Sequence, residues 1–293
     1  MLVKVCFSVF IVLFLASCSS PHEHKLKISA TTWIGYTPLF YAKEKGWLKP
    51  LDIKVLKVSS LSENMHLYEA GNADAYVGTQ YEYEAMIKAE PTLMPIMMFD
   101  RSNGGDMVMS NTSITELQKS SESIDVYLEL DSINRTLFDD FIKRYKLEDK
   151  KFNYFNKNQA YIATLNTKNI KNNSLVITYI PYNSELEKNG FKELVSTKDG
   201  LELFVVDALF VRKEMLLEHK QQFIALKKLV DKAIIKLKED PYEFYTVVKP
   251  YMTDISYEEF QDSLEGIIWI NTENSPKFMQ RMKTAGIPIE GLI

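Results

Sequence analysis

The stretch TTWIGYTPLFYAKEKGW, residues 31 to 47, directly follows a short apolar strand candidate, LKISA. Its second half predicts a helix from Pro38 to Lys45, because Pro suits a first helical position and Gly46 supplies a stop. Its first half, TWIGY, is typical of a strand-to-helix loop that carries large aromatic side chains and the N–H groups of a helix start. We therefore expect Trp33 and Tyr36 to form one wall of a ligand site.

The N-terminus has the features of an exported lipoprotein. Residues 1–18 combine one Lys with the apolar run VCFSVFIVLFL and the segment LASC, which predicts a signal peptide that is too short for a membrane span. LASC resembles the lipobox of bacterial lipoproteins, so we expect Cys18 to be lipidated and to anchor the chain to the bilayer. Residues 19–24 then form a polar tether. An ordinary soluble signal peptide with an incidental Cys is the alternative.

Composition limits the remaining function classes. The 293 residues are 46% hydrophobic, and 35 basic and 39 acidic residues are interspersed along the chain. Removal of residues 1–18 leaves enough chain for two lobes of about 100 to 150 residues each. The mixed charges give no sign of a nucleic-acid groove. Cys18 is the only Cys of the processed chain and the four His are scattered, so we expect no disulfide, metal or other cofactor.

Strand and helix patterns alternate along most of the chain. The strand candidates LKISA, DIKVLKV, ADAYVG, LMPIMMF and DMVMS are separated by helix patterns, which favours an α/β lobe with a largely parallel sheet. A second set runs from SIDVYLE to SLVITYI, then comes one long apolar strand, LELFVVDALFVR, and then mostly helix. We predict a bilobal α/β protein, with lobe 1 at residues 25–109 and 206–293 and lobe 2 at residues 110–205. The crossovers are expected near residues 109–112 and 204–207.

Three loops of the predicted first lobe combine aromatic and polar residues. TWIGY follows the first strand, GTQYEYE the third and FDRSNGGD the fourth. The carboxyl ends of parallel strands meet at one edge of a sheet, where ligands collect in open α/β folds. The sequence therefore predicts a ligand pocket at this edge, within a cleft between the lobes.

Five segments resemble, in order and spacing, the substrate-binding proteins of nitrate, sulfonate and taurine type importers. They are WIGYTPLFYAKEKGWLK, LYEAGNADAYVGTQYE, FDRSNGGDMVM, ITYIPYNSEL and VVDALFVRKEMLLEHKQQFIALKKLVDKAI. The resemblance spans Lys25 to about Asn271. It implies a type II periplasmic-binding-protein fold, a monomer that closes over a small molecule and presents it to an ATP-binding-cassette (ABC) permease on the periplasmic side of the cell envelope.

The family pattern is matched at single positions. The matching residues are Trp33, Gly35, Pro38, Gly71, Ala73, Asp74, Ala75, Asp100, Ser102, Asn103, Gly104, Pro181, Tyr182 and Asp207. The sequence departs from the pattern where the family usually has Trp-Glu-Pro-Tyr, because this chain has Tyr179, Ile180, Pro181 and Tyr182. A ligand preference based on that Trp or Glu does not carry over.

Acidic and aromatic residues dominate the expected cleft. We predict ligand contacts from Trp33, Tyr36, Thr79, Tyr81, Glu82, Asp100, Asn103, Glu129, Tyr179, Tyr182 and Asp207. Asp106 and Asp131 add to the acidic side chains nearby, and Arg101 is one of few bases. Such a pocket suits an amine or a nitrogen heterocycle through ion pairs and stacking. The alternative is a small anion such as a nitrate or sulfonate, held by hydroxyls and helix-start N–H groups.

Two further classes remain open. Pyrimidine-forming proteins of thiamine synthesis resemble this fold, but their chemistry uses His and Cys clusters that this sequence does not offer, so we expect no enzyme. A tethered binding protein that signals to a membrane receptor would use the same closed surface as one that feeds a permease. Ser19 after the Cys leaves both inner and outer membrane open as the site of the anchor.

Overall fold

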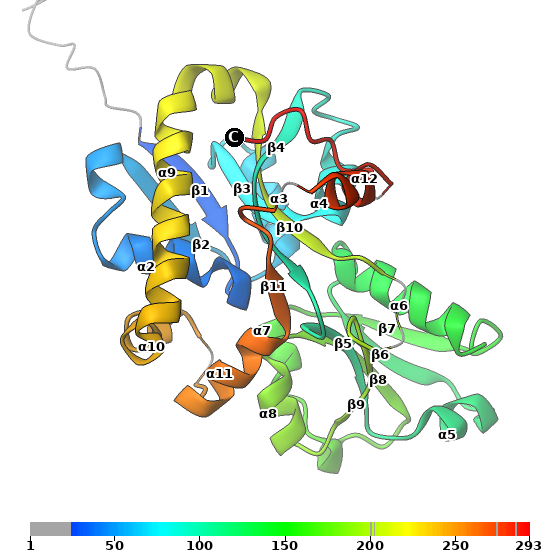
Figure 1. The fold of residues 1–293 in the computed structure, drawn as a ribbon. Helices are drawn as coiled ribbons and strands as arrows, with labels where there is room; N and C mark the ends of the chain where they lie inside the picture. The colour runs from blue at the N-terminus through cyan, green and yellow to red at the C-terminus, as the bar shows by residue number, and fades with distance from the viewer. Residues whose placement is uncertain (1–24, 200, 202, 253, 274, 285) are drawn as a thin grey trace, which may run out of the picture.

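The computed structural model describes residues 25–293 apart from 200, 202, 253, 274 and 285. The predicted Cys18 lipidation site, the signal peptide and the tether lie outside the described residues. The chain forms two β-sheets, each covered by helices, in two bodies that Figure 1 shows side by side. The predicted bilobal α/β class is confirmed. We call the body built on the first sheet the first lobe and the other the second lobe.

The first sheet has the strand order β11-β4-β10-β3-β1-β2. Its strands are β1 (Leu26–Ala30), β2 (Ile53–Lys57), β3 (Ala75–Thr79), β4 (Leu93–Ser102), β10 (Val206–Arg212) and β11 (Ile267–Trp269). β1 is parallel to β2 and β3, and β10 is antiparallel to both β3 and β4. β4 therefore runs in the direction of β1 and β3, and the carboxyl ends of these three strands share one edge, as the loop order predicts.

Helices cover both faces of the first sheet. On β3 and β10, Val77 and Leu209 face one core, whereas Tyr76 and Phe210 face another, because successive side chains of a strand point to opposite sides. The helices of this lobe are α2 (Thr37–Glu44), α3 (Leu61–Glu69), α4 (Gln80–Met86), α9 (Lys213–Glu239), α10 (Pro241–Val248), α11 (Tyr257–Glu265) and α12 (Pro276–Thr284), with 3₁₀ turns at Ile34–Tyr36, Lys49–Leu51 and Lys249–Tyr251.

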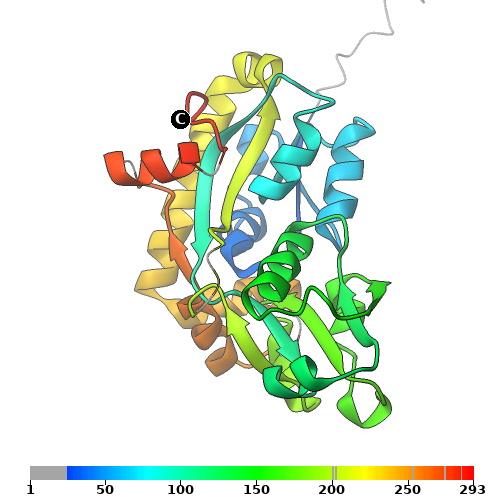
Figure 2. The ribbon, with the colours of Figure 1, turned by 90° about the vertical axis from the view of Figure 1, so that its right-hand side faces the viewer.

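The second sheet has the order β7-β6-β8-β5-β9. Its strands are β5 (Asp106–Ser110), β6 (Ile124–Leu128), β7 (Phe152–Asn156), β8 (Ser174–Tyr179) and β9 (Lys192–Ser196). Its helices are α5 (Ile114–Lys119), α6 (Ile133–Arg144), α7 (Gln159–Ile162) and α8 (Asn183–Lys188), with a 3₁₀ turn at Thr167–Asn169. Figure 2 shows this lobe below the long strands β4 and β10 of the first sheet.

The chain crosses between the lobes at residues 103–105 and returns between the end of β9 at Ser196 and the start of β10 at Val206. The first crossing precedes the expected position near residues 109–112, because β5 already pairs with β8 and β9. Gly104, with φ +111°, permits the bend. The expectation of one long strand over LELFVVDALFVR is wrong: the strand begins at Val206, and the side chain of Gln80 donates to the carbonyl of Phe204 (2.5 Å) and accepts from the N–H of Val206 (3.0 Å). The lobe boundaries predicted from sequence stay a prediction.

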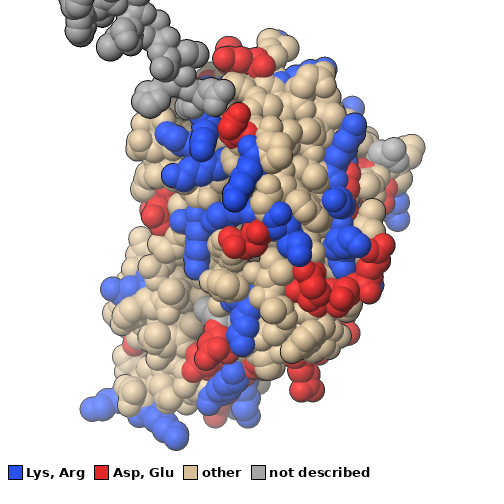
Figure 3. Space-filling view, turned by 90° about the vertical axis from the view of Figure 1, so that its left-hand side faces the viewer, with Lys and Arg blue, Asp and Glu red and all other residues tan. Residues whose placement is uncertain are grey.

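The outer surface beside α2 and α9 carries charges of both signs. Figure 3 shows Lys and Arg gathered on the upper part of this face with Asp and Glu among them. Within the described part of the chain, no helix has both the length and the apolar character that crossing a bilayer requires.

Candidate functional site

A small cavity lies between the two lobes at the shared edge of β1 and β3. The side chains around it come from both lobes and from the returning crossing: Thr31, Trp33, Tyr36, Leu61, Thr79, Asp106, Ile133, Tyr179, Val205 and Asp207. Its volume is about 10 Å³, which is roughly one water-sized sphere. An organic ligand therefore requires the lobes to move apart from this arrangement.

Trp33 forms the aromatic wall of the cavity and touches both lobes. Its side chain is 5% exposed, and its Nε1–H donates to Asp100 Oδ1 at 3.0 Å. Its ring meets the ring of Tyr179, from the second sheet, edge-on at 5.7 Å between centroids. A side chain at position 35 would force Asp100 to shift, because a Cβ there would lie 1.8 Å from Asp100 Oδ2. The TWIGY loop is thus held by Asp100 from β4.

Three aspartates gather beside this wall. Asp106 and Asp207 line the cavity, whereas Asp100 is not among the lining residues and accepts a hydrogen bond from the Trp33 indole. Tyr36 Oη donates to Asp207, whereas Asp100 Oδ2 and Asp106 Oδ2 are buried without a hydrogen-bond partner among the described residues. Burial raises the pKa of Asp100 to about 8 and that of Asp106 to about 7. Burial, followed by repulsion from Asp100, also raises the pKa of Asp207 well above its ordinary value.

Two glutamates complete the buried acidic group, and both accept hydrogen bonds from the protein. Glu82 accepts from the N–H (2.8 Å) and hydroxyl (2.6 Å) of Thr79, which closes a capping box on α4. Glu129, which follows β6, accepts from the N–H groups of Leu61 (3.3 Å) and Gln159 (3.2 Å). Burial raises the pKa of both groups, that of Glu129 to about 8.

The structure brings most of the predicted contact residues together. Trp33, Tyr36, Thr79, Tyr179 and Asp207 line the cavity. Glu82, Asp100 and Glu129 are bonded directly to residues that line it.

The other three predicted residues also do not line the cavity. Tyr182 is buried and its hydroxyl bonds to that of Thr32 at 2.8 Å. Tyr81 is half-buried and faces a separate groove. Asn103 lies in the first crossing, where its N–H donates to the carbonyl of Gly266 at 2.8 Å.

Sequence reasoning did not include five lining residues among the predicted contacts. Asp106 had a signal, because it is acidic and directly follows the glycine pair at the end of FDRSNGGD. The other four are Thr31, Leu61, Ile133 and Val205. Their residue types are common at helix starts and beside strands, and only the packing of one lobe on the other places them at the cavity.

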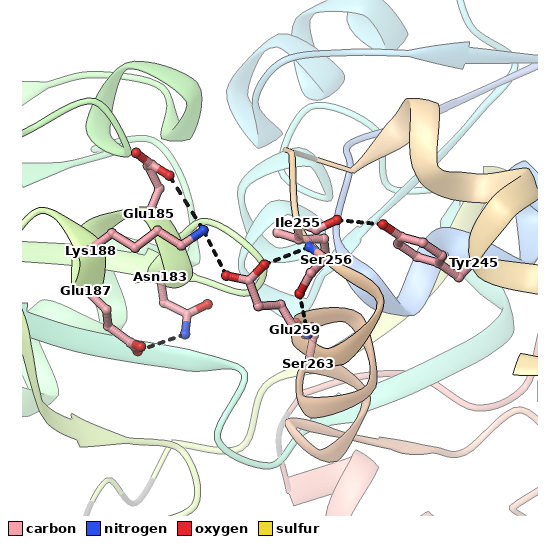
Figure 4. A network of polar contacts seen from close by, with 9 residues as sticks. All are labelled: Asn183, Glu185, Glu187, Lys188, Tyr245, Ile255, Ser256, Glu259 and Ser263. Carbon is pink, nitrogen blue, oxygen red and sulfur yellow. Dashed lines mark hydrogen bonds and ion pairs between the residues drawn. The ribbon is translucent and has the colours of Figure 1, made fainter. Parts of the chain in front are cut away.

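A second contact between the lobes lies on the surface. Lys188 of α8 pairs with Glu259 of α11 at 2.8 Å, and Glu185 lies 4.0 Å from the same ammonium group (Figure 4). The Lys188 side chain is 52% exposed, so water screens this pair and it contributes little to holding the lobes together. Among the described residues, no group of three or more His, Cys, Asp or Glu side chains is arranged to hold a metal ion.

Comparison with known proteins shows similarity in structure rather than in sequence. No family model matches the chain, and no curated protein matches its sequence. The ligand-binding component of an ABC-type import system from Staphylococcus aureus, solved with zinc bound, has a TM-score of 0.70 at 16% identity and covers 89% of this chain and 90% of its own.

Two further solved structures are similar over most of the chain. The periplasmic aliphatic sulphonate binding protein of Escherichia coli has a TM-score of 0.66 at 11% identity and covers 89% of this chain and 90% of its own. The periplasmic nitrate-binding protein of Synechocystis has a TM-score of 0.61 at 15% identity and covers 82% of this chain and 70% of its own. The two sheets, the cleft and these similarities together show that the chain has the periplasmic binding protein fold.

Proposed function

We propose that this protein is an extracytoplasmic solute-binding protein that closes over a small cationic or nitrogen-containing organic molecule and delivers it to an ABC import permease. The fold supports the binding role, since the three compared structures are described as binding proteins or binding components. One observation carries the ligand class: the Asp106 carboxyl is 4% exposed, lines the interlobe cavity and has an oxygen without a hydrogen-bond partner.

The charges around the cavity favour a cation. Asp106 and Asp207 line it, and no Lys or Arg is among its described lining residues. A buried carboxylate without a counter-charge is costly, and an ammonium or protonated ring nitrogen supplies both a charge and N–H donors. The faces of Trp33, Tyr36 and Tyr179 suit such a group through cation–π contact.

A small anion would find fewer partners at this site. The nearest helix-start N–H groups, those of Leu61 and Ile133, already donate to Glu129 and Glu82. An anion could also bind only while Asp106 and Asp207 stay protonated, because an ionised carboxylate would repel it strongly across this poorly hydrated space. The ligand class of the sulphonate and nitrate binders therefore does not carry over with their fold.

A thermal-shift screen tests this proposal. The panel contains monoamines, diamines, guanidinium compounds and protonated heterocycles, compared with nitrate, methanesulfonate and zinc. A ligand at a hundredfold excess over its Kd stabilises the protein by about 2.7 kcal/mol. We expect stabilisation by a member of the cationic organic group. Stabilisation by nitrate or methanesulfonate alone would overturn the ligand class, and stabilisation by zinc alone would indicate a metal-binding protein.

Replacement of Asp106 by Asn tests the carboxylate itself. Asn keeps the shape and removes the charge, so we expect the affinity for the cation found in the screen to fall about tenfold to a hundredfold. Calorimetric titration gives the affinity, and Asp149→Asn, at an exposed position, is the matched control. An Asp106→Asn protein that binds the cation as tightly as the wild type would remove Asp106 from the site.

The lipid anchor is proposed on the LASC segment alone. We expect the wild-type protein to take up labelled fatty acid and to fractionate with membranes, and the Cys18→Ser protein to do neither. Metabolic labelling followed by membrane fractionation measures both properties. Identical behaviour of the two proteins would show that the chain has no anchor at this position.

A further inference from the structure

Two glutamates of the cleft are bonded across the lobes in a reciprocal pattern. Glu82 belongs to α4 of the first lobe and accepts from the N–H of Ile133 (3.2 Å), the first residue of α6 in the second lobe. Glu129 belongs to the second lobe and accepts from the N–H of Leu61 (3.3 Å), the first residue of α3 in the first lobe. Each lobe thus places one carboxylate on a helix start of the other.

Each glutamate is also fixed within its own lobe. Glu82 accepts from Thr79, and Glu129 accepts from the N–H of Gln159 at the start of α7. Both side chains are buried, with exposed fractions of 0% and 3%. A carboxylate at a helix start satisfies an N–H group that has no partner within the helix, and it meets the positive end of the helix dipole. Separation of the lobes would leave the N–H groups of Leu61 and Ile133 without these acceptors.

We propose that Glu82 and Glu129 are a reciprocal latch that holds the two lobes closed. Both contacts are hydrogen bonds buried from water, so they are stronger than the exposed pair of Lys188 and Glu259, which water screens. The latch also determines what the cleft accepts: the N–H groups at the starts of α3 and α6 serve the protein's own carboxylates and are withheld from an anionic ligand. This second consequence rests on the proposed cation-binding function, whereas the closing action does not.

Amide hydrogen exchange on the protein without added ligand tests the latch. In Glu129→Gln only one side-chain oxygen remains for the N–H groups of Leu61 and Gln159. Because Gln159 belongs to the same lobe as residue 129, we expect Leu61 to lose its acceptor and to exchange about tenfold or more faster. The decisive position is Ile133, whose acceptor Glu82 is unchanged. If the two contacts close the lobes as one unit, Ile133 also exchanges about tenfold faster in Glu129→Gln, and Leu61 does so in Glu82→Gln. Small-angle scattering should show a larger radius of gyration for both variants.

The matched control is Glu116→Gln. Glu116 also caps a helix start, α5, but it is exposed and bonds to Thr112 and Ser113 of its own lobe. The Glu116→Gln variant should leave the exchange rates of the Leu61 and Ile133 amides and the radius of gyration unchanged. If Glu129→Gln does not fold, Glu129→Asp keeps the carboxyl group and shortens its reach. Faster exchange confined to the amide that lost its own acceptor, with wild-type scattering, would overturn the latch and leave the ligand class untouched.

Discussion

The Trp33→Ala protein should lose about 3 to 5 kcal/mol of unfolding free energy in the absence of ligand. The indole is 5% exposed, its Nε1–H is the hydrogen-bond donor to Asp100, and its ring contacts Tyr179 across the lobes. The substitution removes this packing and leaves a second oxygen of a buried carboxyl unsatisfied. Denaturant unfolding followed by circular dichroism measures the loss.

Trp47→Ala is the matched control for this prediction. Trp47 is only partly buried, packs on Tyr41 away from the cavity and lies under the ammonium group of Lys232 at 4.0 Å. Its loss should cost less stability and leave ligand affinity unchanged, whereas Trp33→Ala should lower both. An unfolding free energy of Trp33→Ala close to that of the wild type would mean that the indole contributes to the ligand surface and not to the core.

The protein without ligand should become less stable as the pH rises from 5 to 8. Burial raises the pKa of Asp106 to about 7 and the pKa values of Asp100 and Glu129 to about 8. A carboxyl whose pKa is raised by folding stabilises the folded state fully below its unfolded pKa, near 4, and this stabilisation is lost as the pH rises through the folded pKa. Between the unfolded and the folded pKa, each such group lowers the free energy of unfolding by about 1.4 kcal/mol for each pH unit.

Melting temperatures across this pH range measure the effect. Asp106→Asn removes one of the three groups, so the fall in its melting temperature between pH 5 and 8 should be shallower than that of the wild type. A wild-type melting temperature that rises over the same range would show that these carboxyls are ionised at low pH in the folded protein. The raised pKa values would then be wrong, and the ionised carboxyls would be stable in the site without a bound cation.

Sequence patterns predicted most of the local structure. The helix from Pro38 was expected because Pro precedes an apolar face, and the helix after Arg212 because charged and apolar residues alternate at helical spacing. The TWIGY loop was placed correctly at the edge of the sheet, since β1 and β3 are parallel and their carboxyl ends coincide.

The remaining features depend on contacts between residues far apart in the chain. Gln80 bonds to Phe204 and Val206, where the strand begins later than the run LELFVVDALFVR suggests, and nothing in that apolar run marks the break. Glu82 and Glu129 were predicted as ligand contacts from their charge. Their bonds to Ile133 and Leu61 depend on how one lobe packs on the other, which no periodicity within either segment encodes.

The strand order of the first sheet has a consequence for how the chain folds. All five strands of the second sheet come from one continuous stretch, residues 106–196, so that lobe has the pairing partners it needs as soon as the stretch is complete. The first sheet places β10 between β3 and β4, and β10 comes after the whole second lobe in the chain. Until residues 206–212 arrive, β3 and β4 each expose an unpaired edge, which is a template for aggregation. The second lobe should therefore fold before the first, and the docking of β10 between β3 and β4 should be the slow, long-range step.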